Sequence, residues 1–467
     1  METGKGERTL SVETQSKSQG GCLIGLDLGS SSVKGVLLDL CGNLLAEVSR
    51  ENRLLTPQAG WVELDPAAHL ENVCGILREL SDATPDGVLA VAMAAASGNT
   101  VLTTAAGEPL GPIISWMDER TAAHAPTVLS GLETEAVRRI TGWPCVNSFP
   151  LAHLAWLQEN RPELVRRAGH VGMDTDWLLY QLTGRWCMDH STATTFHLQD
   201  QCTGDYHPPF LDRLGIRRET LSELVQSGHP VGTLRPELAR RTGLSENTLL
   251  VTGCFDHPAA ARAAGVIEPG MLMLSCGTSW VGFVPCETRE AALDARMLCD
   301  PFLSDTGGPW AGMFSVPRIG LTVAAYIDQV IAPDIPPEQR LRVFDDLAAA
   351  SPPGARGVTI DLREPLRRPA AADAADVSRA VMESAARLIA ERLDSLRAAG
   401  FAHRRAVMVG GPSRSPVWPA IVAALTGLDV TVGGRAAGAR GAAMLAGIGA
   451  GVYADERVAL AAWRTER

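Results

Sequence analysis

The sequence predicts an α/β protein built from two domains. Its 467 residues exceed the length of one ordinary domain, and a hydrophobic content of 46% is enough for two cores. Apolar strands alternate with amphipathic helices, which is the pattern of α/β architecture. A strand–turn–strand pattern near the N-terminus also recurs in the second half. We expect a polar, disordered tail over residues 1–20, a first domain over 21–247 and a second domain over 248–467.

The first domain opens with a predicted β-meander. Residues 22–28 and 33–38 are apolar strands around the turn Gly29-Ser30-Ser31-Ser32. The turn Cys41-Gly42-Asn43 then leads into a third strand at 44–49. The polar, Arg-rich stretch 233–248, which precedes another apolar strand, marks the expected domain boundary.

A short internal repeat suggests that the two domains are related. Residues 26–33 align with residues 274–281, and four of the eight positions are identical: Leu, Gly, Ser and Val. So short a match also arises by chance. A duplicated domain with one phosphate-binding hairpin in each half is the interpretation that uses both segments.

The second domain carries clear helical and strand signals. Residues 376–399 place apolar side chains on one helical face and end at Gly400, a suitable C-cap. A strand at 406–409 then runs into Gly410-Gly411-Pro412-Ser413, and a helix is expected at 417–425.

The composition excludes several functional classes. A net charge of −11 argues against binding to nucleic acid or to anionic lipid, and no stretch is apolar over the roughly 18 residues that a membrane span needs. Ten scattered cysteines without a Cys-x-x-Cys pair indicate reduced thiols. We expect a soluble cytoplasmic protein; a homodimer is compatible with the sequence, which does not fix the oligomeric state.

Three segments have the residues that phosphoryl transfer requires. The glycine and serines that follow Asp27 can form an anion nest beside a carboxylate, and Gly277-Thr278-Ser279 resembles them. Asp256 ends an apolar strand, where catalytic groups of α/β proteins often lie. The alternatives are two ordinary hairpin turns and a carboxylate that only caps the helix near Pro258.

Six motifs in order resemble the FGGY carbohydrate kinases, and xylulokinases in particular. They span residues 22–453 of the chain: Asp27-Leu-Gly-Ser-Ser-Ser-Val-Lys34, Gly60-Trp-Val-Glu-Leu-Asp-Pro66, Ile114-Ser-Trp-Met-Asp-Glu-Arg120, Gly253-Cys-Phe-Asp256, Gly277-Thr-Ser279 and Gly410-Gly-Pro-Ser-Arg-Ser415. The resemblance implies two ribonuclease-H-like domains of the actin and hexokinase type, which close a central cleft over ATP and sugar. It also implies that the first domain binds the sugar and that the second binds the nucleotide and carries the catalytic aspartate.

The resemblance assigns expected roles to individual residues. Asp256 is the expected general base, and Asp27 the expected carboxylate for Mg²⁺, acting through water; the two should face each other across the cleft. The expected ATP contacts are Gly29, Ser30, Ser31, Lys34, Gly277, Thr278, Gly410, Gly411 and Ser415. The expected substrate contacts are Ser97, Gly98, Asn99, Thr100, Val101, Trp116, Asp118 and Asp256.

The sequence departs from the xylulokinase pattern at three places. Asn99-Thr100-Val101 replaces the usual Gln-Met-His, which puts the sugar in doubt. His153 stands where the family has a lysine, and a lone histidine is more often structural than catalytic. A long segment is cut down to 351–357, which could open the nucleotide cleft.

The expected activity is ATP-dependent phosphorylation of a primary hydroxyl on a small ketose or polyol, with D-xylulose as the first substrate to test. The alternative is a sugar-responsive binding or regulatory relative that has lost turnover. Retention of Asp256 favours the enzyme, because a binding protein needs no base there.

Overall fold

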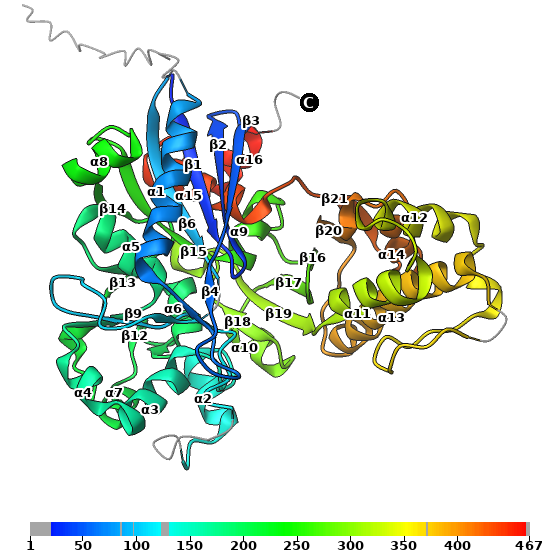
Figure 1. The fold of residues 1–467 in the computed structure, drawn as a ribbon, viewed down its shortest axis with the longest axis horizontal. Helices are drawn as coiled ribbons and strands as arrows, with labels where there is room; N and C mark the ends of the chain where they lie inside the picture. Colours follow the sequence, from blue (N-terminus) through cyan, green and yellow to red (C-terminus); the bar gives the residue numbers. More distant parts are fainter. Residues whose placement is uncertain (1–19, 85, 97, 123–129, 370–371, 464–467) are drawn as a thin grey trace, which may run out of the picture.

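The chain forms two six-stranded sheets with helices around and between them (Figure 1). The computed structural model describes residues 20–84, 86–96, 98–122, 130–369 and 372–463. The first sheet has the order β14-β15-β6-β1-β2-β3. Its strands are β1 (Cys22–Leu28), β2 (Ser32–Asp39), β3 (Leu44–Glu51), β6 (Val88–Ala95), β14 (Pro230–Thr233) and β15 (Leu249–Phe255). The meander predicted from the sequence is confirmed, since β1 pairs antiparallel with β2, and β2 with β3.

Alternate residues of β1 belong to two different hydrophobic core clusters, one on each face of the sheet. Ile24 and Leu26 face one side of the sheet, which packs against α1 (Pro66–Asp82) and α5 (Asp174–Thr183). Leu23 faces the other side, where α9 (Asp256–Ala263) and α15 (Ala437–Gly449) lie. Because successive side chains of a strand point to opposite faces, both sides of this sheet are buried.

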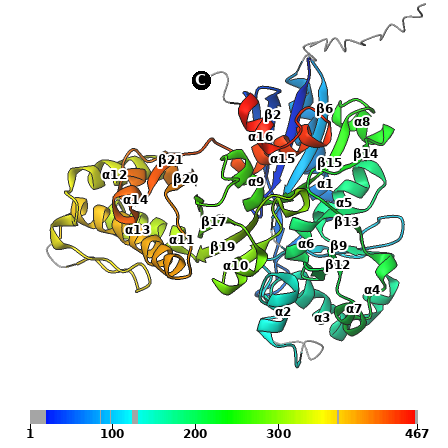
Figure 2. The same ribbon diagram turned by 180° about the vertical axis from the view of Figure 1, so that it is seen from behind.

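A mixed subdomain extends the first sheet. It contains small sheets made of β4 (Leu54–Leu55), β5 (Glu63–Leu64) and β8 (Ile113–Ile114); β7 (Val101–Thr103) and β9 (His170–Gly172); β10 (Cys187–Asp189) and β13 (Glu223–Val225); and β11 (Gln199–Asp200) and β12 (Asp205–Tyr206). Its helices are α2 (Thr134–Thr141), α3 (Pro150–Asn160), α4 (Pro162–Arg167), α6 (His190–Phe196) and α7 (Pro208–Leu214), and α8 (Pro236–Thr242) follows beside α1. Figure 2 shows α2, α3, α4 and α7 gathered in the lower part of the view, whereas α16 (Glu456–Ala462) lies near the top.

The second sheet repeats the topology of the first. Its strands are β16 (Met271–Cys276), β17 (Trp280–Cys286), β18 (Leu298–Asp300), β19 (Trp310–Val316), β20 (Arg405–Gly410) and β21 (Asp429–Val432). The order β19-β17-β16-β20-β21 corresponds to β3-β2-β1-β6-β15, with the same parallel and antiparallel pairs. The two hairpins that match in sequence therefore occupy equivalent places, which supports the duplication.

Helices cover the outer face of the second sheet. They are α10 (Arg289–Asp294), α11 (Ile319–Tyr326), α12 (Pro337–Ala350), α13 (Ala374–Ala398) and α14 (Trp418–Thr426). The expected helices at 376–399 and 417–425 and the strand at 406–409 correspond to α13, α14 and β20. The shortened stretch 351–357 packs on α13, where Ser351 Oγ donates to Asp376 Oδ1 over 2.5 Å and the Gly354 amide donates to Glu383 Oε1 over 2.8 Å.

The structure differs from the expected division of the chain at residue 247. β15 pairs parallel with β6, so this strand and Asp256 at its end belong to the first sheet. Helix α15 also returns from the second half and packs on β1, β6 and β15. The expected boundary at residue 247 differs from the structure because β15 pairs with β6, and the local sequence around 233–248 does not reveal this pairing.

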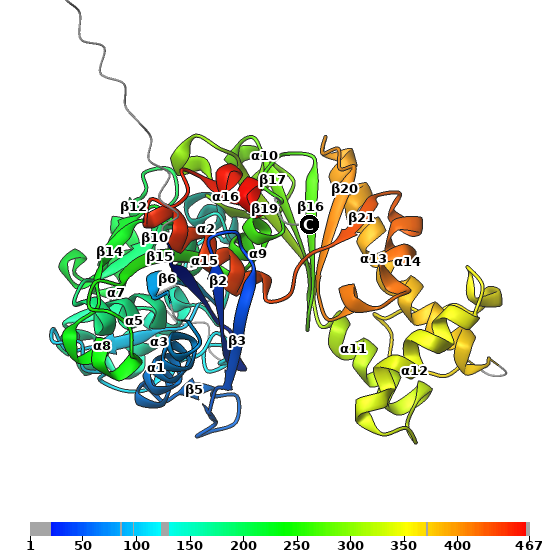
Figure 3. The same cartoon turned by 90° about the horizontal axis from the view of Figure 1, so that it is seen from above.

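Glycines allow α15 to approach its neighbours closely. A Cβ on Gly25 of β1 would lie 1.8 Å from the Ala439 carbonyl oxygen, and one on Gly441 would lie 1.8 Å from the Ala259 carbonyl oxygen. Backbone atoms cannot rotate away as a side chain can, so any side chain at these positions must push the helix off. Figure 3 shows α9 and α15 between the two sheets. One core cluster contains side chains from both helices and from both sheets.

We predict that Gly441→Ala destabilises the protein by about 1–3 kcal/mol, because the added methyl separates α15 from α9. The urea midpoint measured by tryptophan fluorescence should fall clearly. Gly111→Ala is the matched control, since nothing lies within 4 Å of its Cβ position, and it should change stability by less than about 0.5 kcal/mol. Equal midpoints for the two variants would contradict the close packing described here.

Candidate active site

A pocket of about 340 Å³ lies at the carboxyl ends of the central strands of both sheets. The first sheet contributes Asp27 and Lys34, and helix α9 contributes Asp256 and His257. The second sheet contributes Ser275 at the end of β16 and Gly410 at the end of β20. Carboxyl ends of parallel strands are where open α/β sheets bind ligands.

The two predicted carboxylates share this pocket, but they come from the same sheet. Asp27 is near the end of β1, and Asp256 directly follows β15, with β6 between the two strands. The expectation that they face each other from different domains is therefore wrong. The wall opposite them comes from the glycine-rich ends of β20 and β21.

Asp27 is held in a setting that disfavours its charge. Burial, and then the charge of Asp256, raise its pKa from 3.8 to about 6, while Lys34 and His257 oppose the shift. Lys34 is the direct partner of Asp27 across the β1–β2 ladder. A Cβ on Gly438 would lie 2.7 Å from Asp27 Oδ2, so the start of α15 reaches the carboxylate only because residue 438 has no side chain.

Asp256 does not act as the helix cap that the sequence allowed. It is the first residue of α9, Phe255 is the N-cap, and no side chain makes a capping hydrogen bond there. Its described partner is His257, whose Nδ1 lies 2.5 Å from Asp256 Oδ1. Burial lowers the pKa of His257, but the charge and hydrogen bond of Asp256 outweigh burial and raise it above 6.5.

The turns of the two hairpins are partly exposed, and hydrogen bonds from neighbouring segments hold each turn in place. In the first, Trp116 Nε1 donates to Ser30 Oγ over 2.7 Å and Asn52 Nδ2 donates to the Gly29 carbonyl over 2.8 Å. In the second, the Gly320 amide of α11 donates to the Thr278 carbonyl over 3.0 Å. Ser31, Gly277 and Thr278 are exposed.

The predicted nucleotide loop lies only partly in the pocket. Gly410 and Gly411 line it, but Ser415 instead donates from Oγ to Asp345 Oδ1 over 2.6 Å and accepts from the Trp418 amide at the start of α14. Sequence reasoning missed a second set of lining residues after β21: Gly433, Gly434, Arg435, Ala436, Ala437 and Gly438. A glycine pair between a parallel strand and a helix was the available signal.

The expected substrate segment after β6 is mostly buried. Ser97 lies outside the described residues. Asn99 Nδ2 donates to Asp174 Oδ2 over 2.8 Å, and its Oδ1 accepts from the Trp116 amide over 3.1 Å. Gly98 sits against the Phe149 ring with φ of +45°, and Val101 is fully buried at the start of β7. Asn99 thereby fixes the backbone of Trp116, which remains partly exposed.

Thr100 and His153 form a buried polar pair. Thr100 Oγ1 and His153 Nδ1 share a hydrogen bond of 2.9 Å. Burial lowers the pKa of His153 to about 3, so the ring is neutral at physiological pH. A lysine in this place would bury a charge, whereas the neutral imidazole contacts Thr100 inside the protein.

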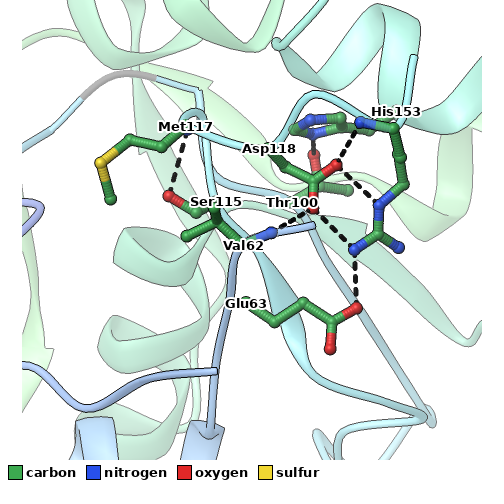
Figure 4. A network of polar contacts seen from close by, with 8 residues as sticks. Val62, Glu63, Thr100, Ser115, Met117, Asp118 and His153 are labelled. Atoms are coloured by element: carbon green, nitrogen blue, oxygen red, sulfur yellow. Dashed lines mark hydrogen bonds and ion pairs between the residues drawn. The ribbon is translucent and has the colours of Figure 1, made fainter. Parts of the chain in front are cut away.

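Asp118 is fully buried and saturated with hydrogen bonds (Figure 4). Its Oδ1 accepts from the Arg120 amide and Nε, both over 2.8 Å, and its Oδ2 accepts from the Val62 amide over 2.7 Å and from Arg120 Nη2 over 2.8 Å. Arg120 also donates to Glu63 and stacks 3.8 Å from the Trp61 ring centre. Of the expected substrate contacts that the structure describes, Trp116 and Asp256 are the partly exposed ones.

Among the described residues, no cluster of three or more His, Cys, Asp or Glu side chains could by itself hold a metal ion. Asp27 is an oxygen donor in the pocket, and Mg²⁺ commonly uses one or two carboxylates together with water and substrate phosphates. The donor set fits a metal brought in with the nucleotide. No helix in the described part of the chain has the length and apolar character to cross a membrane.

We predict that Asp27→Asn stabilises the ligand-free protein at pH 8 and has little effect at pH 4. Between about pH 4 and 6 the folded protein holds a proton on Asp27 that the unfolded chain has lost. The free energy of unfolding of the wild type therefore falls as the pH rises through this range, and the full cost of the buried charge is present above pH 6. The gain at pH 8 should be about 1–3 kcal/mol. Thermal unfolding in EDTA would test this. A lower melting temperature for the Asn variant at pH 8 would contradict it.

Comparison with known proteins identifies the family. The family model described as "FGGY family of carbohydrate kinases, N-terminal domain" matches residues 22–262, and the one for the C-terminal domain matches residues 336–450. The first match runs past Asp256, in agreement with the sheet pairing.

Individual relatives and solved structures are similar over nearly the whole chain. The autoinducer-2 kinase of Escherichia coli K12 is 28% identical over 474 residues, covering 93% of this chain and 87% of its own. The xylulose kinase of Rhodospirillum rubrum has a TM-score of 0.80 at 25% identity, covering 92% of this chain and 91% of its own. The gluconate kinase of Lactobacillus acidophilus has a TM-score of 0.84 at 20% identity, covering 93% and 90%. The chain belongs to the FGGY family of carbohydrate kinases, phosphotransferases with an alcohol group as acceptor.

Proposed function

We propose that the chain transfers the γ-phosphoryl group of ATP to a primary hydroxyl of a small ketose or polyol. The observation that carries this proposal is one pocket in which two carboxylates and a lysine face the glycine-rich strand ends of the second sheet. Such an arrangement supplies a base, positive charge and backbone donors around a polyphosphate.

In the proposed reaction Asp256 accepts the proton of the attacking hydroxyl. The oxygen forms a bond to the γ-phosphorus as the bond from phosphorus to the β,γ-bridging oxygen breaks, and the electron pair leaves with ADP. Lys34 lies in the pocket with a charge that can offset the phosphate oxygens. The amides of the exposed hairpin turns at Gly29–Ser31 and Gly277–Thr278 are proposed to hold the transferred group.

We propose ATP with Mg²⁺ as the nucleotide substrate. Asp27 would hold the ion through water, and when bound the ion would neutralise charge on the phosphates. Burial and Asp256 raise the pKa of Asp27 to about 6 in the ligand-free protein, so a bound cation would stabilise its charged form. The chain's own glycines at Gly410–Gly411 and Gly433–Gly434 leave room for the nucleotide on the opposite wall.

The acceptor is proposed from the kinase relatives and from the residues beside Asp256. D-Xylulose is the first compound to test, and autoinducer-2 is the second, because the autoinducer-2 kinases match 93% of this chain. The panel should also include gluconate and glycerol. Trp116, fixed by Ser30 and Asn99, is the proposed contact on the acceptor side.

A coupled assay of ADP release with this panel distinguishes the enzyme from the alternative. Turnover with one acceptor, above the rate of ATP hydrolysis in water alone, supports the kinase. Binding of an acceptor without release of ADP would support a sugar-responsive relative that has lost catalysis.

We predict that Asp256→Asn lowers kcat on the best acceptor by about 10²- to 10⁴-fold, because the amide cannot take the hydroxyl proton. Nucleotide binding and the melting temperature should stay close to wild type, since Asp256 makes no capping bond in α9. Single-turnover kinetics and ATP titration would measure both properties. Near-normal kcat in this variant would mean that another group is the base.

A further inference from the structure

We propose that His257 is a positioning residue for Asp256: its ring fixes the carboxylate in the orientation that accepts the substrate proton. This inference rests on the proposed function, since it needs Asp256 to be the general base. His257 directly follows Asp256 and lies outside the six motifs that resemble the family.

The geometry ties the two side chains together at the first turn of α9. His257 Nδ1 lies 2.5 Å from Asp256 Oδ1, and both residues line the pocket. A carboxylate rotates readily about its last side-chain bond, and a hydrogen bond to one oxygen stops that rotation. With Oδ1 engaged, Oδ2 is the oxygen left for the acceptor hydroxyl.

The imidazole is itself held in place by aromatic rings. It stacks on Phe255, with ring centres 5.3 Å apart and planes at 20°. Phe255 meets the edge of Trp143 at 5.7 Å, and Trp143 Nε1 donates to the Cys299 carbonyl over 3.0 Å. The chain of contacts therefore runs from Asp256 into the protein interior, where it cannot move freely.

Charges around the pocket favour the same bond. Asp256 and Asp27 are the carboxylates that raise the pKa of His257 against burial, and Lys34 is the nearby cation on the same wall. An ionised carboxylate can only accept, so the contact between Nδ1 and Oδ1 requires a proton on Nδ1, which the charged ring and the Nδ1–H tautomer of the neutral ring both carry. In the reaction the proton of the hydroxyl moves to Asp256, and His257 neither gains nor loses one.

Neither a metal site nor a helix cap accounts for His257. Among the residues that the structure describes, His257 belongs to no group of three or more His, Cys, Asp or Glu side chains that could hold a metal ion. His257 also does not satisfy the start of α9, where no side chain makes a capping hydrogen bond.

The test compares His257→Leu with His257→Asn in the coupled assay. Leu fills the space without a donor, whereas Asn places an amide N–H near the position of Nδ1. The Leu variant should lose about 10- to 100-fold in kcat, with the KM for ATP changed less than about threefold, because a misplaced base slows the chemical step. The Asn variant should keep at least a third of the wild-type kcat.

A second comparison places each variant in the Asp256→Asn background, measured as single turnovers. If His257 acts through Asp256, His257→Leu adds no further loss there. A loss that multiplies with that of Asp256→Asn, or an Asn variant as slow as the Leu variant, would overturn the inference.

The controls separate this inference from the proposed function. If the wild type is active on an acceptor and the His257→Leu variant is equally active, the role of His257 is overturned and the proposed function stands. Wild type inactive on every acceptor overturns both. Melting temperatures of the two His257 variants within about 3 °C of each other exclude a difference in folding as the cause.

Discussion

The close contact of helix α15 with strand β1 is the constraint on which the pocket depends. Gly25 lets the helix backbone touch the strand, and Gly438 lets the helix begin beside Asp27. The loop that precedes α15 is the glycine-rich end of β21, so this contact brings the glycine-rich wall of the second sheet to the first sheet's carboxylates. We expect a side chain at either glycine to displace α15 and, with it, that wall.

Charges of both signs line the pocket: the carboxylates are Asp27, Glu47 and Asp256, and the cations are Lys34, Arg414 and Arg435. Burial is the larger cause of the raised pKa of Asp27, and repulsion from the Asp256 carboxylate adds to it. Lys34, placed opposite Asp27 by strand pairing, and His257, placed next to Asp256 by sequence, each offset part of that repulsion. A cation bound beside Asp27 would favour the charged carboxylate and lower its pKa, so cation binding would be linked to the ionisation of the site.

Sequence reasoning reached the fold and the two carboxylates because both depend on local patterns. The meander at residues 22–49 and the helix α13 follow from periodicity and turns, and the family motifs give Asp27 and Asp256. The pairing of β15 with β6 joins segments more than 150 residues apart, and no local signal reports it. For the same reason the sheet that carries Asp256 could not be assigned.

The substrate segment shows a different limit. Asn99, Thr100 and Asp118 belong to a motif region, yet their polar atoms are used inside the protein by Asp174, His153 and Arg120. Whether a polar residue of a motif touches the ligand or supports one that does depends on the direction of its side chain, which the motif does not contain. Trp116 is the partly exposed residue of this network, and hydrogen bonds to Asn99 and Ser30 fix its backbone and its ring.

The return of α15 to the first sheet also has a consequence for synthesis on the ribosome. One face of β1, β6 and β15 is covered by a helix that begins at Ala437, and Tyr453 Oη donates to the Leu40 carbonyl over 2.7 Å from still farther along the chain. At about 5–20 residues per second, the nascent first sheet waits on the order of ten seconds or more for the helix that covers it. During that interval its apolar face is open to water and to other chains, so we expect the N-terminal half to be the part of the chain most prone to aggregate during synthesis.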